Sequence, residues 1–395
     1  MHAHNICRAP VATRPRSRGF TLIELMVGLV LGMLAILVIT AVMASAEGKK
    51  RTVAMGSDAQ VNGALALYTL QTEIQTAGYG ASSNKPALGC QVKGKFTDPD
   101  AAAGSGPTDI SFTLVPVEIV NGVDGAPDSL TVLQSQTSLF SAPIRVVETH
   151  DRTQDYFLVQ SSLGVAPGDL LIAVPPTPSA TEWCTMFAAT NNTGSAATTL
   201  SYDRIPHTAA GNPAWNHSEV FPEVNYAGAP IAMPAPQSYL LSMGNLTRRT
   251  YTVSSAGNLQ VTGMTSRSVA STPSDLFPNI VNFQAMYGKD TDANGIVDRW
   301  DSTTPTNQAE WAAVLAVRIA IVARSTQYEK EIVTTANPQW DIGGSDTTAD
   351  VTPVDCTGST NKCIPIKVDN LSDWKHYRYK VYDSVIPLRN MLWSQ

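Results

Sequence analysis

The chain has 395 residues, of which 43% are hydrophobic and 15% charged, and its formal net charge is −6 at pH 7. This acidic balance disfavours a general electrostatic attraction to nucleic acid, so we expect no direct nucleic-acid binding. The sequence contains no Walker loop, no Gly-x-Ser-x-Gly and no His-Glu-x-x-His. We therefore predict a protein that is not an enzyme and that uses no organic cofactor.

An apolar run near the N-terminus is long enough to cross a membrane. From Phe20 to Met43 it has 24 residues, which as a helix cover roughly 36 Å, against about 30 Å for a bilayer core. A secretory signal peptide has a shorter apolar core. Four arginines precede the run, so the N-terminus should stay cytoplasmic and the bulk of the chain should lie on the other side of the membrane.

The run contains a single charge, Glu24. A carboxylate at membrane depth is costly and usually has a functional partner. If the chain is cut after Gly19, the new amine of Phe20 lies one helical turn from Glu24, at the positive end of the helix. The alternative is that Glu24 sits near the membrane interface and reaches the headgroups.

The residues around this junction resemble the class III signal of type IV prepilins and pseudopilins, which is a short basic leader ending in Gly followed by Phe-Thr-Leu-Ile-Glu-Leu. The resemblance implies that a prepilin peptidase cleaves between Gly19 and Phe20 and methylates the Phe20 amine. It also implies that Glu24 pairs with the N-terminal amine of a neighbouring subunit in a filament. An ordinary signal anchor would leave both features unexplained. Cleavage removes four of 27 basic residues and no acidic residue, leaving 23 against 33 and a net charge of −10.

Helical spacing of apolar residues continues from residue 44 to residue 77, and Gly78 is a natural C-terminal stop. Gly48, Gly56 and Gly63 each cost up to about 1 kcal/mol relative to alanine in a helix interior. We therefore expect this part of the helix to bend or loosen.

Beyond Gly80, short β-branched and aromatic runs alternate with turn residues, which predicts a β-rich head. The proline-rich run 228–236 is the expected boundary between two β subdomains. In residues 309–324 we expect a short helix turning into a central strand, and in residues 377–382 a half-buried strand near the end of the sheet that Pro387 terminates. Other expected strands are Ser129–Gln134, Tyr156–Gln160, Asp169–Val174, Tyr239–Met243, Thr250–Ser254, Leu259–Thr262 and Val281–Tyr287.

Four cysteines remain after removal of the leader, which fits an oxidising compartment and allows three disulfide pairings. Cys356 and Cys363 enclose a turn-like loop. We therefore favour the pairs Cys356–Cys363 and Cys90–Cys184 over the other two connectivities. No Cys-x-x-Cys spacing supports a thioredoxin-like or structural zinc site.

Residues 290–301 match the spacing of a calcium-binding loop, with a glycine at position 6. Position 12 carries Asp where the EF-hand pattern has Glu, and a strand is expected before the loop in place of a helix, so we predict a weak Ca²⁺ site outside an EF-hand. The alternative is a tight Asn-Gly turn surrounded by solvated acids. The expected ligands are Asp290, Asp292, Asn294, the Ile296 carbonyl, Asp298 and Asp301.

Short stretches along the chain resemble landmarks of the PilW family of minor type IV pilins. They are Gln75-Thr-Ala-Gly-Tyr-Gly, Asp128-Ser-Leu-Thr-Val, Tyr287-Gly-Lys-Asp-Thr-Asp and Val385-Ile-Pro-Leu-Arg-Asn. The resemblance implies an α+β, type IV pilin-like fold with a long N-terminal helix and a large β-rich head. The expected parts are a leader (1–19), a membrane and filament-core helix (20–43), its amphipathic continuation (44–80) and the two parts of the head (81–235 and 236–395).

The same resemblance implies a minor pilin of a tip or priming complex, which supports pilus assembly and thereby twitching motility, adhesion or DNA uptake. Its location would be the bacterial inner membrane, with a periplasmic C-terminus, and then the pilus. The implied partners are other minor pilins, the major pilin, an adhesin-like tip protein, the inner-membrane assembly machinery and the prepilin peptidase. The alternatives are a minor pseudopilin of type II secretion and a calcium-dependent tip adhesin.

Overall fold

A computed structural model describes the chain in two units, residues 1–55 and residues 56–395. The described residues are 19–101, 106–136, 142–191, 203–229, 236–269, 272–344, 347–348 and 353–393, and for residues 48–58 and 347–348 only the backbone is described. The expected leader, apart from Gly19, and most of the proline-rich run 228–236 lie outside these ranges. The predicted α+β organisation, an N-terminal apolar helix followed by a β-rich head, is confirmed.

The first unit contains the start of helix α1 (Leu22–Thr76). Within it, the 26 residues Leu22–Glu47 form a helix long and apolar enough to cross a membrane. All described side chains of this segment are exposed within the unit. Apolar side chains on every face of a helix are typical of a segment that lipid or other helices surround.

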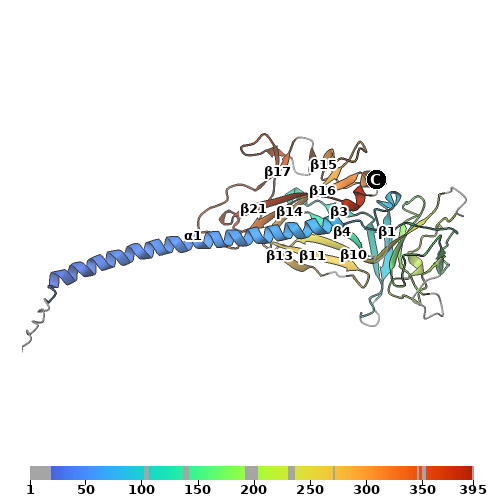
Figure 1. Cartoon of the computed structure of the whole chain (residues 1–395), viewed down its shortest axis with the longest axis horizontal. Helices are drawn as coiled ribbons and strands as arrows, with labels where there is room; N and C mark the ends of the chain where they lie inside the picture. The colour runs from blue at the N-terminus through green and yellow to red at the C-terminus, as the bar shows by residue number, and fades with distance from the viewer. Residues whose placement is uncertain are drawn as a thin grey trace, which may run out of the picture. The chain divides into compact units, whose positions relative to one another are not determined.

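In the second unit, the last turns of α1 pack against strands of both large sheets (Figure 1). Ala66, Leu70 and Ile74 recur at helical spacing and are fully buried. Gly63 allows close approach to the second sheet, because a Cβ atom there would overlap the Tyr382 ring and lie 3.1 Å from Ala323 Cβ. The structure thus gives Gly63 a packing role.

The C-terminal end of α1 is held by distant residues. The helix ends at Thr76, and Gly78 follows with a φ of 77°, as the glycine stop predicts. Asn390 Nδ2 donates to the carbonyl oxygens of Thr76 at 3.2 Å and Ala77 at 2.8 Å. These bonds satisfy carbonyl groups that the end of a helix leaves without an internal partner.

The larger sheet of the head has eleven strands in the described residues, and most neighbours pair antiparallel. Its main path runs β12-β11-β10-β7-β8-β1-β2, with β13 on β11, β3 on β4, and β4 and β5 on β10. The strands are β1 (Gln91–Phe96), β2 (Thr108–Thr113), β3 (Val117–Val120), β4 (Ser129–Gln136), β5 (Ile144–Arg145), β7 (Leu170–Val174), β8 (Cys184–Ala188), β10 (Tyr239–Val253), β11 (Asn258–Thr265), β12 (Ser268–Val269) and β13 (Ser274–Pro278).

The two predicted strands Tyr239–Met243 and Thr250–Ser254 are wrong as separate elements, because β10 is one strand of 15 residues. Gly244, with a φ of 51°, sits where the pairing with both β7 and β4 shifts register. A bulge of this kind bends a strand without ending it. β10 pairs with β7, which precedes the boundary predicted between residues 235 and 236, and with β11, which follows it. Residues on both sides of that boundary therefore belong to one sheet.

The second sheet has the order β18-β15-β14-β16-β21 in the described residues. The expected turn from helix to strand is confirmed, since α2 (Gln308–Ala312) leads directly into β16, which lies between β14 and β21. The strands are β14 (Ile280–Lys289), β15 (Arg299–Asp301), β16 (Val314–Arg324), β18 (Thr347–Thr348) and β21 (Tyr379–Pro387).

Smaller elements complete the head. A three-stranded sheet packs against β14 and β16, and a two-stranded ribbon carries a separate aromatic core. They comprise β17 (Gln339–Gly343), β19 (Val354–Asp355), β20 (Lys362–Pro365), β6 (Tyr156–Leu158), β9 (Arg204–Pro206), α3 (Arg389–Leu392) and the 3₁₀ helices η1 (Lys85–Ala87), η2 (Val123–Gly125), η3 (Ser218–Val220) and η4 (Trp374–His376).

The favoured cysteine pairing is confirmed. Cys90 and Cys184 join the start of β1 to β8, with 6.0 Å between their Cα atoms. Cys356 and Cys363 close the short loop between β19 and β20, with a Cα separation of 5.0 Å.

Candidate functional site

The start of α1 is closed by reciprocal hydrogen bonds between Thr21 and Glu24. The Glu24 backbone N–H donates to Thr21 Oγ1 at 3.3 Å, and Glu24 Oε2 accepts from the Thr21 backbone N–H at 3.5 Å and from its hydroxyl at 3.3 Å. This is a capping box, in which side chains satisfy N–H groups that the first helical turn leaves open. The signal Thr-x-x-Glu was present in the sequence, although the sequence reasoning did not use it.

The predicted cleavage junction directly precedes this capping box. Gly19 and Phe20 lie in non-helical backbone, and the Phe20 side chain is 85% exposed. The junction is therefore accessible to a peptidase in this structure. Cleavage there would leave the new amine of Phe20 next to Thr21 and one helical turn from the Glu24 carboxylate.

The predicted calcium loop connects β14 to β15 and brings three of its aspartates together. Carboxylate oxygens of Asp290, Asp292 and Asp298 lie within 4.8 Å of one another. Backbone N–H groups fold the loop onto Asp290, whose Oδ2 accepts from Gly295 at 2.7 Å and whose Oδ1 accepts from Asn294 at 3.1 Å. Burial would raise the pKa of the Asp290 carboxyl, but these two N–H groups together with interactions with Asp292 and Ala293 lower it.

Asn294 and Asp298 form further hydrogen bonds within the loop. Asn294 Oδ1 accepts from the Ile296 N–H at 2.8 Å, and Asn294 Nδ2 donates to Asp292 at 2.9 Å. Thr291 donates to Asp298 through its N–H at 3.0 Å and through its hydroxyl at 2.9 Å. Asp301 is not a member of the three-carboxylate group.

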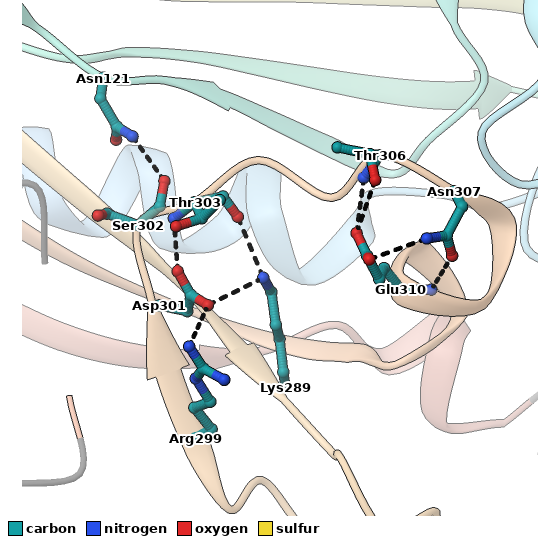
Figure 2. Close-up of polar contacts among 9 residues, drawn as sticks. All are labelled: Asn121, Lys289, Arg299, Asp301, Ser302, Thr303, Thr306, Asn307 and Glu310. Carbon is teal, nitrogen blue, oxygen red and sulfur yellow. Dashed lines mark hydrogen bonds and ion pairs between the residues drawn. The ribbon is translucent and has the colours of Figure 1, made fainter. Parts of the chain in front are cut away.

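Asp301 instead forms ion pairs with two cations, as Figure 2 shows. Its Oδ2 lies 3.3 Å from Lys289 Nζ and 3.1 Å from Arg299 Nη2, and its Oδ1 accepts from the Thr303 N–H at 2.6 Å. The side chain is only 6% exposed. Burial would raise the pKa of Asp301, but the bonds from Thr303 and the charge of Lys289 outweigh burial and lower it.

The segment after Asp301 is fixed by side-chain hydrogen bonds around the N-cap of α2, Asn307 (Figure 2). The Glu310 N–H donates to Asn307 Oδ1 at 3.0 Å, and Glu310 Oε2 accepts from the Thr306 N–H at 2.7 Å. The Thr306 N–H is the main cause of a lowered pKa at Glu310. The loop, β15 and α2 surround a cavity of about 860 Å³ lined by Asp290, Arg299 and Glu310 among others.

Three converging carboxylates form an all-oxygen donor set, which suits a hard divalent cation such as Ca²⁺. Asp290, Asp292 and Asp298 fit this role. Asp301 is already compensated by Lys289 and Arg299, so a cation at the loop would be held by fewer ligands than the twelve-residue spacing predicts.

Sequence reasoning also missed a buried histidine pair in the aromatic core around β6 and β9. His150 Nε2 lies 2.9 Å from His207 Nε2, and His150 stacks on Phe157 with 3.7 Å between ring centroids. Burial is the main cause that lowers the pKa of His150 to about 4 and that of His207 to about 3. Both rings are neutral at pH 7, and one N–H donates to the other ring.

Two comparisons with protein families match separate parts of the chain. The model of the prokaryotic N-terminal methylation motif matches residues 14–45, which contain the Gly19–Phe20 junction and Glu24. The model described as type IV pilus-assembly protein W matches residues 246–390, from within β10 to α3. Comparisons with curated proteins and with solved structures found no match.

Proposed function

We propose, from the premise that this chain belongs to the PilW family of type IV minor pilins, that it joins a tip or priming complex for pilus assembly. The chain is a type IV pilus-related pilin with a single-pass inner-membrane anchor and a pilus-associated extracellular head. Pilin-family domains are structural, and we propose an assembly role without catalysis. The proposed partners are other minor pilins, the major pilin and an adhesin-like tip protein.

The observation that carries this proposal is the position of Glu24. It is the one carboxylate in the first turn of an exposed apolar helix, directly after the junction that the methylation motif contains. A carboxylate in such a segment needs a compensating partner. The processed N-terminal amine of a neighbouring subunit would compensate it once the helix leaves the lipid for a filament.

Glu24→Ala tests this contact. We expect the variant to insert into the membrane and to be processed as the wild type is, but to be lost from sheared pili and from co-purification with other minor pilins. Glu47→Ala is the matched control, because it removes the same group from the far end of the same apolar segment. Normal incorporation of Glu24→Ala would overturn the proposed contact.

A gene deletion tests the proposed role in priming pilus assembly. Deletion of the gene, in a strain without redundant copies, should remove surface pili and twitching, and the wild-type gene should restore both. A strain that keeps its pili but loses type II secretion would instead identify a minor pseudopilin. Unchanged piliation and unchanged secretion would contradict both assignments. DNA uptake in the same strains measures whether the complex also serves transformation.

We further propose that the loop between β14 and β15 binds Ca²⁺ weakly through Asp290, Asp292 and Asp298. The support is the convergence of their oxygens and the all-oxygen chemistry of the group. Calorimetric titration of the purified full chain with Ca²⁺ should release or absorb heat and raise the melting temperature. A titration without heat and without a shift in melting temperature would contradict the site. Surface binding by the purified protein alone, dependent on Ca²⁺, would favour an adhesin.

A further inference from the structure

The last strand of the head, β21, forms one edge of the five-stranded sheet (Figure 1). All nine of its residues, Tyr379–Pro387, pair with β16 in one continuous antiparallel register without a bulge. Among the described residues no strand pairs with its other side. The backbone N–H and C=O groups on one side of β21 are therefore paired with β16 along the whole strand, and those on the other side pair with no described strand.

The ladder identifies the open groups. Just outside β21, the Ser325 N–H donates to the Arg378 carbonyl and the Leu388 N–H donates to the Leu315 carbonyl, both at 2.8 Å. Hydrogen-bonded positions alternate along an antiparallel pair, so even-numbered residues of β21 bond to β16. The N–H and C=O groups of the odd-numbered residues then point away from β16. These residues are Tyr379, Val381, Asp383 and Val385.

This edge is rigid and lightly protected. Ile386 is fully buried beneath the strand, and the Tyr382 ring packs over Gly63 of α1, so β21 is already held extended. Protein edges are usually shielded by bulges, prolines or several charges. Here Pro387 stands only at the end, and Val385 is 51% exposed. Of the two charged residues, Lys380 lies over the Tyr382 ring, 5.0 Å from its centroid, and Asp383 pairs with Arg318 at 3.3 Å.

The direction of β21 decides between two occupants, a second copy and a different chain. Tyr382 lies beside Gly63, and Asn390 lies beside Thr76 and Ala77, so β21 runs in the same direction as the last turns of α1. Pairing of β21 with β21 about a two-fold axis would make the two chains enter their heads in opposite directions. A two-fold pair closes on itself, whereas the proposed tip or priming complex joins a filament that has one direction, so the occupant is a different chain.

We propose that the outer edge of β21 is a β-augmentation site that receives an extended strand of another pilus protein. The backbone groups of four residues would supply main-chain hydrogen bonds, and the exposed Val385 would favour an apolar side chain on the same face of the added strand. This inference rests on the proposed function, because the partner is a member of the same complex.

Val385→Pro in the full chain tests the edge. Proline removes the outward N–H of residue 385 and leaves the bonds between β21 and β16 intact, and Ser384 before it is already extended, as a residue before proline prefers. Val385→Ala is the matched control, because it shortens the side chain and keeps the N–H. Ser384→Pro is the opposite control, because it removes an N–H that bonds to β16 and should destabilise the head.

The readout is co-purification with other minor pilins from solubilised membranes, normalised to the amount of chain present. We expect Val385→Pro to lower recovery by about tenfold, with a melting temperature close to that of the wild type, and Val385→Ala to lower it far less. Equal recovery of Val385→Pro and wild type would overturn the edge inference alone. Failure of the wild type itself to co-purify would overturn the proposed function and this inference with it.

Hydrogen exchange gives a second, residue-specific measurement. In the isolated chain the amides of Tyr379, Val381, Asp383 and Val385 should exchange quickly, while those of even-numbered neighbours are protected by β16. In the complex the same four amides should become protected. Assembly of the complex without any gain of protection at these amides would overturn the inference.

Discussion

Glu73 on α1 and Arg249 on β10 form an ion pair with 2.7 Å between Oε1 and Nη1. Gln134 of β4 adds two bonds to Glu73, one to its carboxylate at 3.0 Å and one to its backbone carbonyl at 3.1 Å. The Glu73 side chain is 18% exposed, so water screens the pair only in part. The last turns of the helix are thereby attached to two strands of the larger sheet.

Glu73→Ala should lower the free energy of unfolding by about 1 to 2 kcal/mol, because it removes the ion-pair partner of Arg249 and one of the hydrogen bonds of Gln134 in a partly screened site. The melting temperature of the full chain in detergent measures this loss. Glu223→Ala is the control, since Glu223 is 91% exposed and lies 3.8 Å from Arg152. An equal decrease in both variants would show that Glu73 does not anchor the helix.

Gly63→Ala should also destabilise the head, even though alanine favours a helix by about 1 kcal/mol over glycine. The added methyl group overlaps the Tyr382 ring, which β21 holds in place. We expect a net loss of about 1 to 3 kcal/mol. Gly28→Ala is the matched control, because no atom lies within 4 Å of a Cβ at that position. A rise in melting temperature for both variants would contradict the packing role of Gly63.

Acid should weaken the core around His150 and His207. Their folded pKa values, about 4 and about 3, lie below the ordinary value of 6.5, so the unfolded chain binds more protons between these limits. The free energy of unfolding therefore falls as the pH falls from about 6.5 to 4, by up to about 1.4 kcal/mol per pH unit for each histidine. Above pH 7 this contribution is constant.

His207→Gln tests this dependence, because glutamine keeps a hydrogen-bonding group and does not titrate. We expect the slope of melting temperature against pH between 4 and 6.5 to decrease markedly in the variant. His376→Gln is the control, since His376 lies outside this core and bonds to the Glu329 carbonyl. A slope unchanged by His207→Gln would assign the acid sensitivity to other groups.

The calcium proposal predicts different effects for two aspartates of the same loop. Asp298→Asn should weaken Ca²⁺ binding, because Asp298 belongs to the converging carboxylates. Asp301→Asn should leave Ca²⁺ affinity nearly unchanged and lower stability, because it uncouples Lys289 and Arg299 from their buried partner. Calorimetry and thermal melting of both variants separate the two roles. Loss of affinity in Asp301→Asn alone would place the cation elsewhere.

Features that depend on local sequence were predictable. The apolar helix follows from composition, its end follows from Gly78, and the turn from α2 into β16 follows from a change in periodicity. The disulfide pairing was favoured because Cys356 and Cys363 enclose a short turn. In each case the residues that determine the structure lie close together in the chain.

Features that depend on long-range pairing were not predictable. The continuity of β10 is set by β7, β4 and β11, which pair with different parts of it. His150 and His207 are 57 residues apart in sequence, and only the fold brings their rings together. Asp301 has the right spacing for a cation ligand, but it forms ion pairs with Lys289 and Arg299 instead. The spacing of acidic residues along a loop gives no information about charged residues on the strands that flank it.

The hydrogen bonds from Asn390 to the end of α1 join an early part of the chain to one of the last parts to be synthesised. The helix is synthesised first, and the part of its cover that β21 and Asn390 provide is synthesised almost last. The packing around residues 66–74 therefore stays incomplete until nearly the whole chain has crossed the membrane. A chain interrupted before β21 would display part of an apolar helix face and an unpaired edge of β16, and both are surfaces that cellular proteases and chaperones recognise.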